Sequence, residues 1–301
     1  MSHSRRNFVK TLTLASASAA LLPTACSSNK DKKLTILHTN DVHSHIDPFP
    51  ANDKKFGNKG GYARRAALVK KIRATEPNVI LLDCGDIFQG TPYFNVFDGK
   101  LDISLMSKMK YDAATIGNHE FDSGAENLAE RVKEAQFPFV CSNYDFTNSP
   151  LESLTKPYEI IKKGDLKIGI IGLGIKLQGL VDPRMCGNIT YNNPIEVANR
   201  LAKKLKEDDQ CDAVICISHL GYKYESDKVS DVEVATKSEN IDVILGGHTH
   251  TFLDEPTIVT NLNQEPVIIN QAGWGGVKLG RIDLTMHAHK KSKTLAYHKM
   301  V

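Results

Sequence analysis

The chain has 301 residues, of which 41% are hydrophobic and 24% are charged, and this ordinary globular composition excludes an intrinsically disordered chain. The formal net charge of +3 comes from three basic residues among the first 25 positions, which contain no acidic residue, so the rest of the chain is neutral. A neutral body gives no electrostatic basis for binding duplex nucleic acid or an anionic membrane surface.

The N-terminus has the pattern of an export signal. Arg5, Arg6 and Lys10 precede a modestly apolar run over residues 11–22, which is too short to be a permanent membrane span. We interpret residues 1–25 as a twin-arginine signal peptide of the lipoprotein type. The alternative is an amphipathic first helix of a soluble protein, which the order of basic, apolar and small residues disfavours.

Cys26 follows a segment that resembles a lipoprotein cleavage site and would carry the lipid. Pro23 departs from the aliphatic residue usual in such sites, so plain cleavage with an unmodified Cys26 is the alternative. Both routes predict a protein outside the cytoplasm, either periplasmic or attached to the membrane only through lipid. We expect residues 26–33 to be a polar tether and residues 34–301 to be the catalytic domain.

The other five cysteines lack the paired spacings of a zinc ribbon. Cys84, Cys141 and Cys216 lie in or beside apolar runs, and we interpret them as small buried hydrophobic residues. A disulfide between Cys186 and Cys211 is compatible with an oxidising compartment, although the sequence does not establish it.

From residue 34 onward, short apolar runs alternate with helical patterns. The expected strands are 34–37, 79–82, 113–116, 167–171, 213–217 and 241–245. The expected helices are 62–73, 101–110, 125–135 and 194–207, and Asn193 should cap the last of them. After His250 the pattern changes to strands at 257–260, 267–270, 279–285 and 294–298. This order predicts an α/β layered domain with mixed sheets.

Five of the expected strand ends carry residue types that bind metals. In chain order they hold Asp41 with His43, then Asp86, then Asn118 with His119 and Glu120, then His219, and last His248 with His250. Each motif alone occurs often by chance, and a lone histidine is usually a surface or hydrogen-bonded residue. Ligands of open α/β sheets bind beyond the carboxyl ends of the strands, so the five motifs together predict one site. Carboxylate, imidazole and amide ligands suit Mn, Zn, Fe or Co.

With these motifs the chain resembles the calcineurin-like metallophosphatase superfamily. His38-Thr39-Asn40-Asp41-Val42-His43 and Gly117-Asn118-His119-Glu120-Phe121-Asp122 are similar to its 5'-nucleotidase branch, and the resemblance extends to the C-terminus. It implies a four-layer α/β/β/α sandwich with two mixed sheets. It also implies an exported phosphoesterase that hydrolyses phosphomonoesters, with nucleotides as the expected substrates.

The resemblance further implies two divalent metal ions, Mn, Zn, Fe or Co. One would be held by Asp41, His43, Asp86 and His250, and the other by Asp86, Asn118, His219 and His248. Asp86 would bridge the ions, and a hydroxide held between them would attack the phosphate.

His119 and Asp122 would form the catalytic pair, according to the resemblance. His119 would stabilise charge on the phosphoryl oxygens or protonate the leaving alkoxide, while Asp122 would orient the ring. Asp122 could also be a helix N-terminal residue, which is compatible with that role. His45 and Glu120 are left outside the site. Three histidines in the basic C-terminal stretch are expected to be solvated: His287, His289 and His298.

Full-length members of this branch are two-domain proteins, in which the C-terminal domain holds the nucleotide. In this chain, by contrast, we expect the residues after His250 to form the closing strands of the first domain. The chain would therefore use a separately encoded substrate-binding domain or hydrolyse simpler phosphate esters unaided. Trp274 is a candidate for a substrate or partner contact, or for local packing. One alternative function is a thiosulfate-oxidation-type thiohydrolase. Another is a non-catalytic, metal-stabilised binding module, against which the intact Asp86 and His119 argue.

Overall fold

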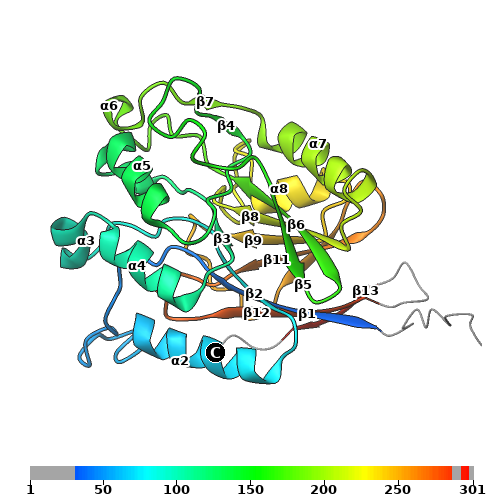
Figure 1. Cartoon of the computed structure of the whole chain (residues 1–301), viewed down its shortest axis with the longest axis horizontal. Coiled ribbons are helices and arrows are strands. Elements are labelled where there is room, and N and C mark those ends of the chain that lie inside the picture. The colour runs from blue at the N-terminus through cyan, green and yellow to red at the C-terminus, as the bar shows by residue number, and fades with distance from the viewer. Residues whose placement is uncertain (1–30, 287–292, 298–301) are drawn as a thin grey trace, which may run out of the picture.

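The computed structural model describes residues 31–286 and 293–297, in which two stacked β-sheets lie between helices (Figure 1). The first sheet has the strand order β13-β12-β1-β2-β3. Its strands are β1 (Lys32–Thr39), β2 (Val79–Asp83), β3 (Ala113–Ala114), β12 (Gly280–Met286) and β13 (Lys293–Tyr297). β1, β2 and β3 are parallel, and β12 is antiparallel to both of its neighbours, so this sheet is mixed.

The second sheet has the order β10-β11-β9-β8-β6-β5. Its strands are β5 (Glu159–Lys163), β6 (Leu166–Leu173), β8 (Ala213–Ser218), β9 (Val243–Gly246), β10 (Thr257–Thr260) and β11 (Pro266–Gln271). The four inner strands are parallel and the two edge strands are antiparallel, which makes this sheet mixed as well. A small ribbon pairs β4 (Tyr144–Asp145) with β7 (Thr190–Tyr191).

Helices cover the outer face of each sheet. Beside the first sheet and its loops lie α2 (Tyr62–Thr75), α3 (Pro92–Phe97), α4 (Lys100–Met109), the 3-10 turn η1 (His119–Phe121) and α5 (Gly124–Glu134). The second sheet is covered by α7 (Pro194–Glu207) and α8 (Asp231–Thr236), while α6 (Pro183–Cys186) is a short turn near α5. In α7 the Asn193 side chain accepts hydrogen bonds from two amides of the first turn, as expected for its cap.

Three hydrophobic clusters separate four layers. Alternate residues of β1 and β2 face opposite sides: Ile36 and Ile80 pack between the sheets, whereas Leu37 and Leu81 pack under α2, α4 and α5. The third cluster lies between the second sheet and α7, where Leu201 contributes. This arrangement confirms the predicted four-layer sandwich with two mixed sheets.

The main differences from the expected elements concern short segments. β3 contains only two residues, because the chain turns away after it toward the Gly117–Asn118 loop. The helices α3, α6 and α8 and the edge strand β5 were not predicted. The three helices have at most six residues each, which is too short for a helical repeat of apolar residues to be recognised.

The cysteine predictions have two outcomes. Cys84, Cys141 and Cys216 are buried as expected. Cys186 and Cys211 are free thiols, so the disulfide between them is not formed: Cys186 packs against the cluster under α5, and Cys211 packs in the cluster under α7.

The predictions for the signal peptide, for Cys26 and for His287, His289 and His298 concern positions outside the described residues. Among the helices of the described segments, none has the length and hydrophobicity that crossing a bilayer requires.

Candidate metal centre

The five predicted motifs meet at one end of the two sheets. Each follows a parallel strand: β1 and β2 deliver Asp41 and Asp86, β8 and β9 deliver His219 and His248, and the loop after β3 delivers Asn118. Parallel strands end at a common edge, and stacking the sheets brings their two edges together. The sequence prediction of a single site is therefore supported by the topology.

Sharp backbone turns orient these side chains. Asp41, His43, Asp86, His248 and His250 all have left-handed backbones, with φ between 48° and 72°. Such values are uncommon for residues other than glycine and concentrate at functional sites. Hydrogen bonds hold the turns, since the Asp41 amide donates to Gly85 O at 2.9 Å and the His43 amide donates to Asp86 O at 3.1 Å.

Two glycines allow the motif loops to approach closely. A Cβ atom on Gly85 would lie 2.6 Å from the nitrogen of Gly117, and one on Gly247 would lie 2.8 Å from His219 Nδ1. A side chain at either position would force these loops apart.

The first candidate metal group consists of Asp41, His43 and His250. One ligand atom from each lies within 4.8 Å of the others. The Nε2 atoms of His43 and His250 are 3.1 Å apart, and His250 Nε2 is 3.3 Å from Asp41 Oδ1. His43 Nδ1 lies 3.1 Å from Phe88 O, a contact that orients the ring and directs Nε2 to the centre.

The second candidate metal group consists of Asp86, His219 and His248. Asn118 joins it, because its Oδ1 lies 2.9 Å from His248 Nδ1. His219 is fully buried, and its Nδ1 lies 2.7 Å from Cys84 O. Its Nε2 is 3.0 Å from Asp86 Oδ2, but their relative orientation does not make a hydrogen bond, so this buried nitrogen has no hydrogen-bond partner among the described residues.

Asp86 faces both groups. Its Oδ2 is 3.0 Å from His219 Nε2 in the second group and 4.0 Å from His43 Nε2 in the first. Its carboxylate is almost completely buried, as is that of Asp41. Together the two groups and Asn118 offer two buried carboxylates, four imidazoles and an amide, and one imidazole nitrogen has no hydrogen-bond partner among the described residues. This set of ligands fits a pair of divalent cations.

His119 and Asp122 form a pair at the rim of the centre. His119 Nδ1 lies 2.8 Å from Asp122 Oδ2, and the His119 ring is edge-on to that of His43, with centroids 5.2 Å apart. The hydrogen bond to Asp122 raises the pKa of His119 to about 9. Asp122 does not cap α5, whose N-cap position is Ser123.

Glu120 is the residue that sequence reasoning missed. It is completely buried, and its carboxylate accepts hydrogen bonds from four backbone amides, those of Gly117, Asp86, Ile87 and Phe88. It therefore joins the β2 loop to the β3 loop. The signal was its place inside the Gly117–Asp122 motif, although Glu120 was left outside the predicted site.

His45 and Trp274 border the centre without joining either metal group. The His45 ring stacks on Phe49, with centroids 4.5 Å apart. Trp274 is half-buried and stacks on His250 at 5.7 Å, while the Gly275 amide donates to Asp41 O at 2.7 Å. The loop that carries Trp274 thus packs directly against the first metal group.

Comparisons with known proteins agree with this geometry. A model of the calcineurin-like phosphoesterase family matches residues 34–252. Human 5'-nucleotidase is 38% identical over 274 residues, which cover 84% of this chain and 46% of that protein. The trifunctional nucleotide phosphoesterase protein YfkN of Bacillus subtilis is 32% identical over 282 residues, covering 83% of this chain and 18% of that protein.

A crystal structure of a 5'-nucleotidase precursor from Thermus thermophilus superposes with a TM-score of 0.78 at 32% identity. The superposition covers 89% of this chain and 55% of that one. The chain thus spans about half the length, or less, of these relatives.

Proposed function

Since the chain belongs to the calcineurin-like phosphoesterase family, we propose that it hydrolyses phosphomonoesters, nucleotides foremost, at a centre of two divalent metal ions. The observation that carries the proposal is the meeting of two metal-binding groups across Asp86, with the His119–Asp122 pair at their rim.

In this proposal Asp41, His43 and His250 would hold one ion, Asn118, His219 and His248 would hold the other, and Asp86 would contribute to both. Two such ions supply positive charge for the phosphate and lower the pKa of a bound water. Manganese, zinc, iron and cobalt all suit these ligands.

His119 is the proton donor in the proposed reaction. Its Nδ1 is engaged by Asp122, which leaves Nε2 free to face the substrate. An alkoxide leaving group is strongly basic, so a proton delivered from His119 Nε2 speeds its departure. Asp122 holds the ring in place and favours its protonated form.

Nucleotides are the proposed substrates because two of the relatives are named 5'-nucleotidases and a third is named a nucleotide phosphoesterase. The described residues contain the complete candidate centre for the phosphate chemistry. We propose that a second, substrate-binding domain supplies recognition of the base, with unaided hydrolysis of simpler esters as the other outcome of the test.

We also propose that the protein is exported, with residues 1–25 as a twin-arginine leader and Cys26 as a lipid attachment point. The support is the order of residues: Arg5 and Arg6 first, then the run over residues 11–22, and then Cys26.

The test is release of phosphate from AMP and from an aryl phosphate, after metals are removed and Mn²⁺, Zn²⁺ or Co²⁺ is restored. Metal-dependent release from either ester supports the proposal. A preference for AMP would show that this chain recognises nucleotides alone, whereas release from the aryl ester only would favour a partner domain. If neither ester releases phosphate but cysteine S-sulfonate releases sulfate, the result would favour the thiohydrolase alternative.

A further inference from the structure

A cavity with several cationic side chains in its wall lies behind the Trp274 loop, at the N-terminal end of α2. Its volume is about 420 Å³. Four cationic residues line it, Lys59, Arg64, Arg65 and Lys278, and its described lining contains no acidic residue. A concave surface with charges of one sign concentrates counter-ions of the opposite sign.

The N-terminus of α2 opens into this cavity. α2 has 14 residues, and its N-cap is Gly61, which has φ 89° and no side chain to accept from the first amides. No acidic residue stands in the first turn either. The Tyr62 amide donates to Ile46 O at 2.9 Å, but no capping side chain or first-turn carboxylate compensates the positive end of the helix dipole, and such a helix N-terminus is a common setting for a bound anion.

Arg65 provides an independent indication of a ligand. Its side chain is buried, with 4% of the residue exposed, yet none of its three guanidinium nitrogens has a hydrogen-bond partner among the described residues. Buried donors are almost always satisfied, so an unpartnered guanidinium points to a missing acceptor. The guanidinium carbon lies 4.2 Å from the centroid of the Tyr62 ring, a contact that offers the nitrogens no acceptor in their own plane.

The guanidinium of Arg65 lies directly against Gly276. Gly276 forms part of the cavity wall, and a Cβ atom added to Gly276 would collide with Arg65 Nη1. Two buried carboxylates, Asp83 and Asp102, influence Arg65 electrostatically, but their hydrogen bonds go to Thr39, Gly85, Ser44 and Tyr62 instead. The guanidinium nitrogens have almost no exposed surface, so a ligand reaches the donors of Arg65 only if Gly276 moves aside.

We propose that this cavity binds a phosphate-type oxyanion, with Arg65 at its floor, the α2 N-terminus at one side and Arg64 and Lys278 at its mouth. Lys278 now pairs with Asp254, which is two-thirds exposed, and can exchange that partner for the anion. Arg64 is exposed and reaches the backbone oxygen of Asn58.

The cavity is separate from the metal centre, because the loop of Trp274, Gly275 and Gly276 stands between them. One side of that loop contacts Asp41 and His250, and the other side borders the cavity. An anion held beneath Gly276 would fix the loop that supports the first metal group. The inference does not depend on the proposed reaction, since binding can be measured without turnover.

The experiment is calorimetric titration of inorganic phosphate into the full chain after its metals have been removed and the chelator dialysed away, so that no cation can hold phosphate at the centre. We expect binding of one phosphate per chain. Arg64→Gln combined with Lys278→Gln should weaken it by about tenfold or more, because each removes a charge-assisted contact. These two side chains are exposed or partly exposed, so the fold should tolerate the change.

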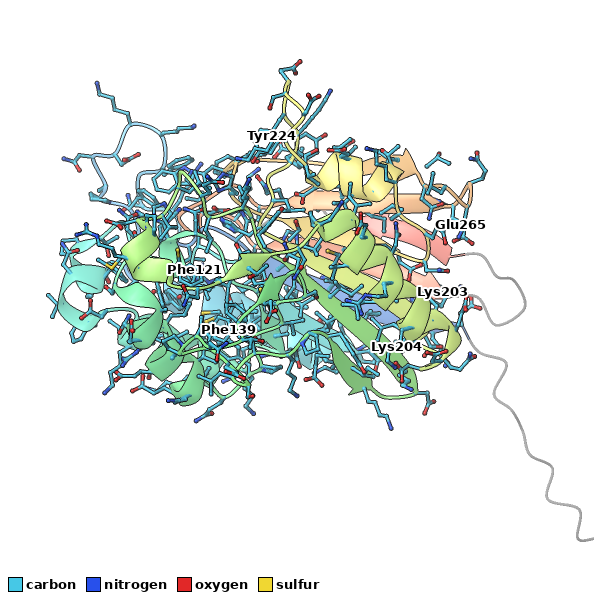
Figure 2. The ribbon with its side chains drawn as sticks, turned by 90° about the horizontal axis from the view of Figure 1, so that it is seen from above. Phe121, Phe139, Lys203, Lys204, Tyr224 and Glu265 are labelled. Carbon is cyan, nitrogen blue, oxygen red and sulfur yellow. The ribbon has the colours of Figure 1, made fainter. Side chains whose placement is uncertain are left out.

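The matched control is Lys203→Gln with Lys204→Gln, which removes the same number of charges from α7 on the opposite side of the molecule (Figures 1 and 2). It should change phosphate binding less than about twofold if only local charges matter. Titration with AMP distinguishes a free phosphate from the phosphate group of a nucleotide. No binding of either ligand, or equal losses in the two double variants, would overturn the proposal.

Discussion

Glu120 Oε2 accepts a hydrogen bond from the backbone amide of Asp86 at 2.9 Å, across a sequence separation of 34 residues. Glu120 thereby fixes the turn that points the Asp86 carboxylate at both metal groups. Burial raises the pKa of Glu120, and the hydrogen bonds from the amides of Gly117 and Asp86 oppose that effect. A buried residue outside both candidate metal groups thus holds the backbone at Asp86.

We expect Glu120→Gln to weaken metal binding, because it disturbs the backbone hydrogen bonds around Asp86. The new NH₂ group faces amide donors, and one mismatched buried hydrogen bond costs about 1–3 kcal/mol. Metal affinity should fall about 10- to 100-fold, as when groups that orient ligands are removed elsewhere. Metal titration and urea unfolding measure the two effects. Exposed Glu126→Gln in α5 is the control, and equal behaviour of the two variants would contradict this role.

His119→Ala should reduce kcat for AMP by about 10²- to 10⁴-fold, the usual range for a lost general acid. The reduction should be smaller for an aryl phosphate whose leaving group departs without a proton. Parallel kinetics on the two esters measure the difference. An equal loss on both would assign His119 to charge stabilisation at the phosphoryl oxygens, and an unchanged kcat would rule out both roles.

Asp102 should make stability depend on pH. Burial raises its pKa from 3.8 to about 7, although hydrogen bonds such as that from Ser44 oppose this effect. Below about pH 4 both the folded and unfolded states bind the proton, whereas between about pH 4 and 7 only the folded state keeps it. The free energy of unfolding therefore falls as pH rises through that window, by an amount on the order of 4 kcal/mol at most.

Asp102→Asn should remove this component, so the variant gains stability relative to the wild type as pH rises. Urea unfolding at pH 5 and pH 8 measures the gain. Exposed Asp227→Asn is the control and should show no such trend. If the free-energy difference between Asp102→Asn and the wild type were independent of pH, this assignment would be wrong.

Most of the candidate ligands could be picked out from the sequence because they occur in short motifs that follow buried strands. Asp41, His43, Asp86, Asn118, His219, His248 and His250 lie together as expected. The predicted assignment of each to one metal stays a prediction, as does the catalytic role of His119 and Asp122.

Contacts between distant segments were not predictable from the sequence. Glu120 was left outside the predicted site because its partners at positions 86 to 88 become neighbours only after folding. Trp274 was similarly ambiguous, since its stacking on His250 depends on the close approach of the loop after β11 to the loop after β9. Short elements such as α8 also carry too few residues for a periodic pattern.

Replacing Arg5 and Arg6 with lysine should block export if residues 1–25 are a twin-arginine leader, because that pathway reads the arginine pair itself. Cell fractionation followed by detection of the protein measures the outcome. Lys10→Arg keeps the pair and should be exported normally. Normal export of the Arg5→Lys, Arg6→Lys variant would contradict the assignment.

The most direct test of the two-metal account is the metal content of the purified chain, measured by mass spectrometry together with AMP turnover, for the wild type and Asp86→Ala. Asp86 faces both candidate groups, so its loss should weaken both sites and abolish turnover. The account predicts two metal ions per wild-type chain and fewer than one in the variant, with no phosphate released. Two retained ions and undiminished phosphate release in Asp86→Ala would contradict it.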